Sequence, residues 1–446
     1  MKMKLFESFR LKFEQADWSK NPEFGLIDSI LEQKPSLIEL ASEDVLKGSK
    51  GSDFGRKDTP SVEQIVRAAI YKELKNYDYR ELEYAQSDSR ICSQFIKLDN
   101  RQPFSFQLFQ KYISKISENT LQKLLMELNK TAIAESLEDV SSLRQDSTVV
   151  ATNIHYPTNN ALVWDCIKES DRLLQKLLEE VQDLDYRDYT KDAKKTYFKL
   201  NNTKSGDKRV DLFNKQLITF TKCINQVANV VKKKAVCSIK ALAVYVSLER
   251  LQPLMYKVYS MTWLKEVSGK AVPNEDKLFS IYELHTDIIV KGGREVQFGH
   301  KVNLTSGKSN LILSCEVLKG NPSDSTLYKH TLDKVIEDYG VVPRDSVTDG
   351  GYASLANAQH AQSKGIRNIV FNKIVGSLKN IVSSKNMETR LKKWRSGIEA
   401  VISNFKRGFN MFVCNWKGEA HFKQKILWSA IAYNIRVMTA AMVKLL

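Results

Sequence analysis

The sequence predicts an α/β protein: a mixed sheet flanked by helices and interrupted after its first strand by an all-α insertion. A β-branched run at 141–154 reads as the first strand, and a hairpin followed by alternating helices and strands begins near residue 298. The stretches 60–138 and 166–275 have the apolar spacing of helices instead. Because strands that alternate with helices form a sheet covered by helices, the two helical stretches become an all-α N-terminal domain and an insertion.

The hairpin and the elements after it follow from residue periodicity. The segment FGHKVNLT (298–305) alternates, and SGKSN then turns the chain into LILSCEVL (311–318). Asp324 is a suitable cap for a helix that ends at Gly340. The strand DSVTDGG, a helix through SLANAQHAQSKG and the strand IRNIVFN complete the predicted sheet.

The two helical stretches leave their roles open. In TPSVEQIVRAAIYKEL, Thr59 suits an N-cap and Pro60 the first helical position. A break near Ser117 fits a DNA-binding helix-turn-helix and also a helical hairpin that binds nothing. In the insertion, KDAKKTYFKLNNTKSGDKR (191–209) fits a loop that grips phosphates and equally a solvated linker.

Composition favours a polyanionic partner and a reducing compartment. The 446 residues carry a net charge of +16, which favours polyanions, and nucleic acid is the commonest of these. A ribosome-associated or membrane-surface protein shows the same excess of charge. Six scattered cysteines without a Cys-x-x-Cys pair argue against a disulfide framework or a zinc finger. The N-terminus has charges among its apolar residues, so we expect no signal peptide. The C-terminal ILWSAIAYNIRVMTAAMVKLL contains Arg436 and Lys444, which favours a buried closing helix over a membrane span.

Charged side chains of mixed sign lie at the edge of one apolar helical stripe. In KWRSGIEAVISNFKRG (393–408) the apolar residues repeat at helical spacing, and Arg395, Glu399 and Lys406 form a column beside them. From the residues alone, an ordinary surface pair is the better explanation of Arg395 and Glu399. Two further acids stand on predicted strands: Asp146 inside RQDSTVV, and Asp349 at the end of VTDGGY. An acid within an apolar strand is costly unless a cation accompanies it.

Several segments resemble the DDE transposases of bacterial insertion sequences, which have an RNase H-like core, and the ISNCY group in particular. The similar segments are RQDSTVVATNIHYPT, FSIYELHTDIIVKGGREVQFGHKV, DSVTDGGYAS, RSGIEAVISNFKRG and YRELEYAQSDSRICSQF. Related transposases carry a helix signature Tyr-x2-Arg-x3-Glu-x6-Lys. Arg395, Glu399 and Lys406 fit that spacing, whereas Lys392 stands at the Tyr position.

The resemblance implies a function and a division of the chain. Asp146, Asp349 and Glu399 are the implied catalytic metal ligands for two Mg²⁺ ions, with Mn²⁺ as an alternative, and Arg395 and Lys406 the implied DNA-binding residues. The implied reaction is two-metal cleavage of phosphodiester bonds at the ends of an insertion sequence, followed by 3′-OH strand transfer into target DNA. The implied segments are a helical DNA-binding or dimerisation region (1–140), the first strand of the RNase H-like core (141–165), a helical insertion (166–280), and the rest of the core with the C-terminal helices (281–446).

The same resemblance sets partners and alternatives. We expect double-stranded DNA as partner, a homodimer or higher assembly on DNA, no membrane, and a cytoplasmic, nucleoid-associated location in a bacterium. Two other interpretations remain: a domesticated or decayed, non-catalytic DNA-binding protein, and another RNase H-like DNA nuclease. Short inverted repeats and a target duplication around the gene would distinguish a transposase from both.

Overall fold

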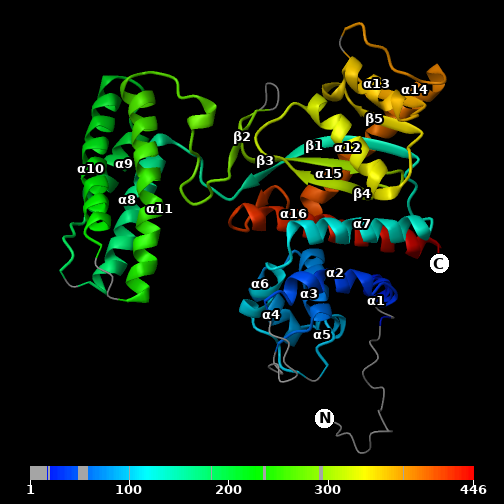
Figure 1. Cartoon of the computed structure of the whole chain (residues 1–446), viewed down its shortest axis with the longest axis horizontal. Coiled ribbons are helices and arrows are strands. Elements are labelled where there is room, and N and C mark those ends of the chain that lie inside the picture. The colour runs from blue at the N-terminus through cyan, green and yellow to red at the C-terminus, as the bar shows by residue number, and fades with distance from the viewer. Residues whose placement is uncertain are drawn as a thin grey trace, which may run out of the picture. The chain divides into compact units, whose positions relative to one another are not determined.

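A computed structural model describes residues 18, 21–48, 59–99, 101–181, 183–234, 238–290, 295–374 and 376–445. The chain divides into two compact units, one formed by residues 1–151 with 289–446 and the other by residues 152–288. The first unit contains the sheet and the second consists mainly of long helices (Figure 1). The boundary at residue 152 falls at the end of the first sheet strand, so the second unit follows that strand in the sequence.

The sheet is mixed, with strand order β2-β3-β1-β5-β6; β4 pairs with β3, and β7 pairs with β1. β1 is antiparallel to β3 and parallel to β5, which is parallel to β6. The predicted hairpin is the antiparallel pair β3–β4. β2 and β7 are short strands that the sequence did not predict. The bounds are β1 Ser142–Thr152, β2 Asp287–Ile289, β3 Gln297–Ser306, β4 Ile312–Val317, β5 Asp345–Asp349, β6 Asn368–Asn372 and β7 Val413–Cys414.

Helices cover both faces of the sheet. On one face, α14 packs against β5 and β6, where Leu391 meets Val347 and Val370. On the other face, Tyr328 of α12 packs against Phe371 of β6. α12 begins one residue after Ser323 and ends at the left-handed Gly340, so its N-cap is Ser323, and Asp324 is its first residue. The bounds are α12 Asp324–Tyr339, α13 Leu355–Ser363, α14 Lys385–Arg395 and α15 Gly397–Gly408.

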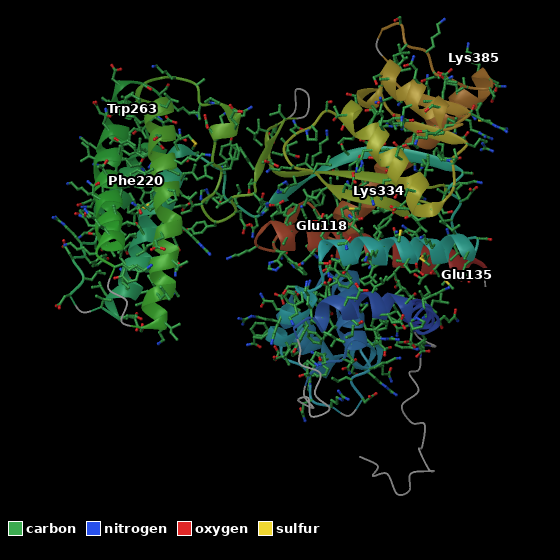
Figure 2. The ribbon with its side chains drawn as sticks, viewed as in Figure 1. Glu118, Glu135, Phe220, Trp263, Lys334 and Lys385 are labelled. Carbon is green, nitrogen blue, oxygen red and sulfur yellow. The ribbon has the colours of Figure 1, made fainter. Side chains whose placement is uncertain are left out.

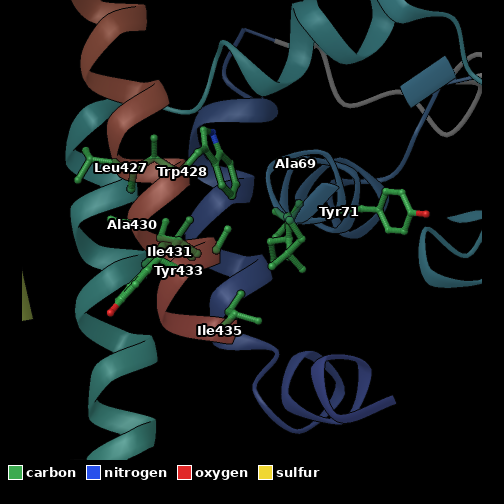
Figure 3. Close-up of a cluster of buried hydrophobic side chains, with 14 of the residues drawn as sticks. Ala69, Tyr71, Leu427, Trp428, Ala430, Ile431, Tyr433 and Ile435 are labelled. Carbon is green, nitrogen blue, oxygen red and sulfur yellow. The ribbon is translucent and has the colours of Figure 1, made fainter. Parts of the chain in front are cut away.

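A group of helices from the two ends of the chain packs together within the first unit. α16 packs against α3 and α7, and side chains from α16 fill the core beside Ala69 of α3 (Figure 3). Figure 2 labels Glu118 and Glu135 at the two ends of α7. The bounds are α1 Pro22–Gln33, α2 Ser36–Val45, α3 Val62–Lys75, α4 Tyr79–Asp88, α5 Arg90–Phe95, α6 Phe106–Ile113, α7 Glu118–Ala134 and α16 Glu419–Leu445.

Local hydrogen bonds explain where these helices begin. Ser61, not Thr59, caps α3: its side chain accepts a bond from the Gln64 N–H, and the Gln64 side chain accepts one in return. Ser117 caps α7 as the predicted break between two helices. α16 is the only described helix with the length and composition of a membrane span, and 67% of its most apolar window is buried inside the protein. A core helix has the same properties.

The second unit is held together by its own apolar core, to which Phe220 belongs (Figure 2). The basic segment 191–209 is not a loop, because α9 and the start of α10 occupy most of it. Its lysines are exposed, whereas Ala193 and Leu200 are buried, so an amphipathic helix replaces the loop that both interpretations assumed. The bounds are α8 Asn159–Leu178, α9 Thr190–Asn201, α10 Asp207–Lys232 and α11 Ile239–Thr262.

Candidate active site

β1 and β5 bring two carboxylates to one place. Their parallel pairing runs as far as Gln145 opposite Thr348, so Asp146 and Asp349 are the next residues on neighbouring strands. Side chains at the same register of parallel strands point to the same face of a sheet. The Asp146 side chain is 15% exposed and the Asp349 side chain is 44% exposed. The Ser147 N–H donates to Asp146 Oδ1 over 2.7 Å, which fixes the orientation of the carboxylate.

Asp349 ends its strand, and the residue after it has no room for a side chain. A Cβ on Gly350 would lie 2.6 Å from the Lys373 carbonyl oxygen and 2.7 Å from that of Asn372. Gly350 is not among the described residues with positive φ. The need for space, rather than the conformational freedom of glycine, therefore explains a glycine at this position.

The helix predicted to carry the third acid is broken into two. α14 ends at Arg395 and α15 begins at Gly397, so Arg395 does not share a helix with Glu399 and Lys406. The predicted apolar stripe does anchor α15. Its buried members are Ile398, Val401, Phe405 and Phe409, and Ile402 is half-buried. Because Glu399 lies in the first turn of α15, its carboxylate is also favoured by the helix dipole.

The Arg395 guanidinium joins the three acids. Its Nη2 lies 3.0 Å from Asp146 Oδ2 and 3.8 Å from Asp349 Oδ2. Its Nη1 lies 2.9 Å from Glu399 Oε1. The Arg395 side chain is only 8% exposed, whereas that of Glu399 is 63% exposed. The structure therefore brings Asp146, Asp349 and Glu399 around one point, with a cation at the centre.

This arrangement still carries excess negative charge, because one guanidinium faces three carboxylates. Carboxylate oxygens are the ligands that hard divalent cations prefer. Within the described residues, no three His, Cys, Asp or Glu side chains already form a metal-binding group. In this structure the Arg395 guanidinium lies between the acids.

Lys406 lies in the wall of a cavity beside β1. The cavity has a volume of about 340 Å³ and is lined by Ser147, Thr148, Val149, Ile289, Glu295, Gln297 and Lys406. The Lys406 Nζ is 5.5 Å from the centre of the Phe412 ring. The lining thus joins Lys406 of α15 to the three residues that follow Asp146 on β1.

Sequence reasoning missed two groups beside the acids. Arg144 is buried on β1, two residues before Asp146. Residues two apart on a strand point to the same face of the sheet, so this spacing could have placed Arg144 beside Asp146. On the other face, Asp324 Oδ1 accepts a hydrogen bond from Ser147 Oγ over 2.9 Å and lies 2.6 Å from Lys301 Nζ. Asp324 was identified only as a helix cap, because its partners are distant in sequence.

Comparison with known proteins gives one match. Residues 286–435 match the family model of the transposase DDE domain. This range contains Asp349, Arg395, Glu399 and Lys406, whereas Asp146 precedes it. No curated protein and no solved structure gives a significant match.

Proposed function

We propose that this protein, a DDE-type transposase by the match of its residues 286–435, binds the ends of an insertion sequence, cleaves phosphodiester bonds there and transfers the 3′-OH strand into target DNA. The observation that carries the proposal is the convergence of Asp146, Asp349 and Glu399 on Arg395. These acids come from β1, β5 and α15, so only the folded chain assembles them.

The three carboxylates are the residues that would hold Mg²⁺ or Mn²⁺. Their fit rests on the donor set: oxygen ligands only, with more negative charge than Arg395 neutralises. Divalent cations bound there supply a water of lowered pKa and stabilise the leaving 3′ oxygen. Rigid strands hold Asp146 and Asp349, whereas Glu399 is the more exposed ligand.

The basic residues are proposed to hold the DNA backbone. Arg395 has planar N–H donors that match a phosphate, and a phosphate becomes its partner once the carboxylates bind cations. Lys406 lines a cavity next to the strand that carries Asp146, which suits a contact to a neighbouring phosphate. Both contacts position the scissile bond without reading sequence.

The rest of the chain supports binding to DNA. The net charge of +16 favours a polyanion. In the helical second unit, exposed lysines line α9 and continue to α10. They suit a contact with transposon-end DNA. The alternatives for this unit are contact with a second protomer and a role in packing alone. The exposed lysines are Lys191, Lys194, Lys195, Lys199, Lys204 and Lys208.

The strand order supports an RNase H-like core. An antiparallel hairpin, β3–β4, lies beside β1, and β5 and β6 follow in parallel on its other side. In this order the first acid lies on the central strand, and the second lies at the end of its parallel neighbour. The helix that carries Glu399, α15, packs on the face of the sheet to which Asp146 points.

The test compares Asp349→Asn with a matched control, Asp333→Asn, on duplexes that carry the DNA flanking the gene. Asp333 pairs with His360 and Lys364 at the surface, and the proposed chemistry does not use it. We expect Asp349→Asn to bind these duplexes normally and to lose Mg²⁺-dependent cleavage, and Asp333→Asn to retain both. Normal cleavage by Asp349→Asn would refute the assignment. Wild-type binding without any cleavage would favour a decayed, DNA-binding protein.

A further inference from the structure

Arg144 is a buried cation that the proposed chemistry does not use. It is 2% exposed and lies on β1, two residues before Asp146 and therefore on the same face. Within the described residues it forms no ion pair with a carboxylate. A buried charge without a counter-ion is costly, so its surroundings must compensate through hydrogen bonds.

Neutral groups from three parts of the fold surround the Arg144 guanidinium. Its Nε donates to Ser306 Oγ at the end of β3 over 2.8 Å, and its Nη2 donates to Asn310 Oδ1 in the hairpin turn. Its Nη1 donates to the Trp394 carbonyl oxygen over 2.9 Å. The guanidinium also stacks on the Trp394 ring, with Cζ 4.7 Å from the ring centre. Arg144 thus ties β1 and the hairpin to the end of α14.

The Trp394 carbonyl stands at the break between α14 and α15. Carbonyl groups at a helix C-terminus lack partners within the helix, and a cation there is favoured by the helix dipole. Arg144 satisfies this carbonyl one residue before Arg395. The break that Arg144 holds is therefore flanked by Arg395 on one side and Glu399 on the other.

Gly397 leaves the space that Arg144 occupies. A Cβ on Gly397 would overlap the guanidinium, at 2.8 Å from its Cζ and closer still to Nη1. Gly397 has no positive φ, so its backbone is one that alanine adopts readily. Space for Arg144, rather than conformational freedom, is the reason for glycine at the start of α15.

We propose that Arg144 is a positioning residue, which holds the turn between α14 and α15 so that Arg395 and Glu399 face Asp146. The absence of a side chain at Gly397 leaves the space that the Arg144 guanidinium needs. The catalytic consequence rests on the proposed function, whereas the coupling between positions 144 and 397 is a property of the fold. Arg144 itself touches none of the three acids in its described contacts.

The test is a double-mutant cycle on the full chain, with Arg144→Ala, Gly397→Ala and both together. Each single change should slow cleavage of saturating end DNA about 10–100-fold, the loss typical of a supporting group, while DNA affinity stays unchanged. In the Arg144→Ala background, Gly397→Ala should cause no further loss, because the guanidinium that its Cβ would meet is gone. Arg144→Lys should recover part of the rate, since lysine restores the charge but not the planar fork.

A control variant separates positioning from simple loss of stability. Val66→Ala removes buried apolar volume from α3, away from the acids, and should lower the urea midpoint while leaving the cleavage rate of the folded protein unchanged. Additive losses in the cycle, or a normal rate in Arg144→Ala, would overturn the proposal. If the wild-type chain does not cleave DNA, the proposed function fails instead. The urea midpoints of the wild type, the two single variants and the double variant then test the coupling between positions 144 and 397. Non-additive midpoints support this coupling, and additive midpoints refute it.

Discussion

Arg395 Nη2 lies 3.0 Å from Asp146 Oδ2, although 249 residues separate the two along the chain. The same guanidinium also reaches Asp349 and Glu399, so a single side chain neutralises part of the charge of three acids. A divalent cation that binds these acids therefore competes with Arg395. DNA assists that competition, because a phosphate near the acids offers the guanidinium another partner.

The first prediction concerns removal of Arg395. Arg395→Gln leaves three adjacent carboxylates without their shared cation. In the absence of metal we therefore expect the unfolding free energy to fall by about 1–3 kcal/mol. This loss is smaller than that for a fully buried pair, because Glu399 is exposed. Added Mg²⁺ should then raise the melting temperature of the variant more than that of the wild type, since the metal takes over the neutralising role. Thermal unfolding with and without Mg²⁺ measures both effects.

The control for that prediction is Arg172→Gln, which removes a surface arginine paired with Glu169 in the second unit. Exposed pairs contribute little, so its melting temperature should change by less than that of Arg395→Gln and should not respond to Mg²⁺. An Arg395→Gln protein that is as stable as the wild type and indifferent to Mg²⁺ would contradict the competition.

The second prediction uses two neighbouring glycines. Gly350→Ala places a Cβ against the carbonyl oxygens of Asn372 and Lys373, and these oxygens cannot move without shifting β6. A Cβ on Gly351 instead has Asp324 Oδ2 as its nearest atom, at 3.1 Å. We expect Gly350→Ala to cost about 1–3 kcal/mol and to slow cleavage by displacing Asp349. Gly351→Ala, the matched control, should have the smaller effect on both. Equal effects in urea unfolding and cleavage assays would show that backbone contact does not set the position of Asp349.

The sequence predicted the sheet well because its strands and helices have strong local signals. Alternation over 298–305 and the β-branched run around Asp146 correspond to β3 and β1, and the order of elements through IRNIVFN is confirmed. β7 is only two residues long, Val413–Cys414, and is fixed by pairing with β1, so no local pattern reveals it.

The sequence indicated which acids converge on Arg395, but not how they are arranged. Spacing and resemblance identified Asp146, Asp349 and Glu399, yet helical periodicity implied one continuous helix through Arg395. The break at Ser396 depends on Arg144, which lies about 250 residues earlier, and on the absence of a side chain at Gly397. Such a tertiary contact overrides local periodicity and leaves no trace in it.

The third prediction concerns a buried carboxylate far from the three acids. Glu73 of α3 contacts Lys72, over 3.0 Å, and Lys425 and Ser429 of α16. Burial opposes its ionisation, but Lys425 and Lys72 outweigh burial and lower the pKa of Glu73 to about 2. An acid with a lowered pKa stabilises the fold above its unfolded pKa, near 4.5, and this contribution disappears as the pH falls toward 2.

Glu73→Gln should therefore destabilise the protein at pH 7 by about 3–5 kcal/mol, since two buried lysines lose their partner. The difference from the wild type should shrink as the pH falls below about 4.5, as measured by urea unfolding at several pH values. Glu118 (Figure 2) forms a partly exposed pair with Lys423. Glu118→Gln is the control and should change stability by under about 0.5 kcal/mol. A pH-independent difference for Glu73→Gln would show that its ionised form is not what stabilises the fold.

The last prediction tests Lys406 as a contact to the DNA backbone. Each phosphate that a lysine neutralises releases counterions, so Lys406→Met should reduce the slope of log affinity against log salt by about 0.9 on duplexes carrying the DNA that flanks the gene. Because the contact positions DNA beside Asp146, cleavage should also fall about 10-fold. Lys334→Met is the matched control: Lys334 pairs with Asp338 on α12, which covers the other face of the sheet, and its removal should change neither quantity. An unchanged salt slope in Lys406→Met, with cleavage intact, would remove Lys406 from the DNA-binding surface and leave Arg395 as the phosphate contact nearest the acids.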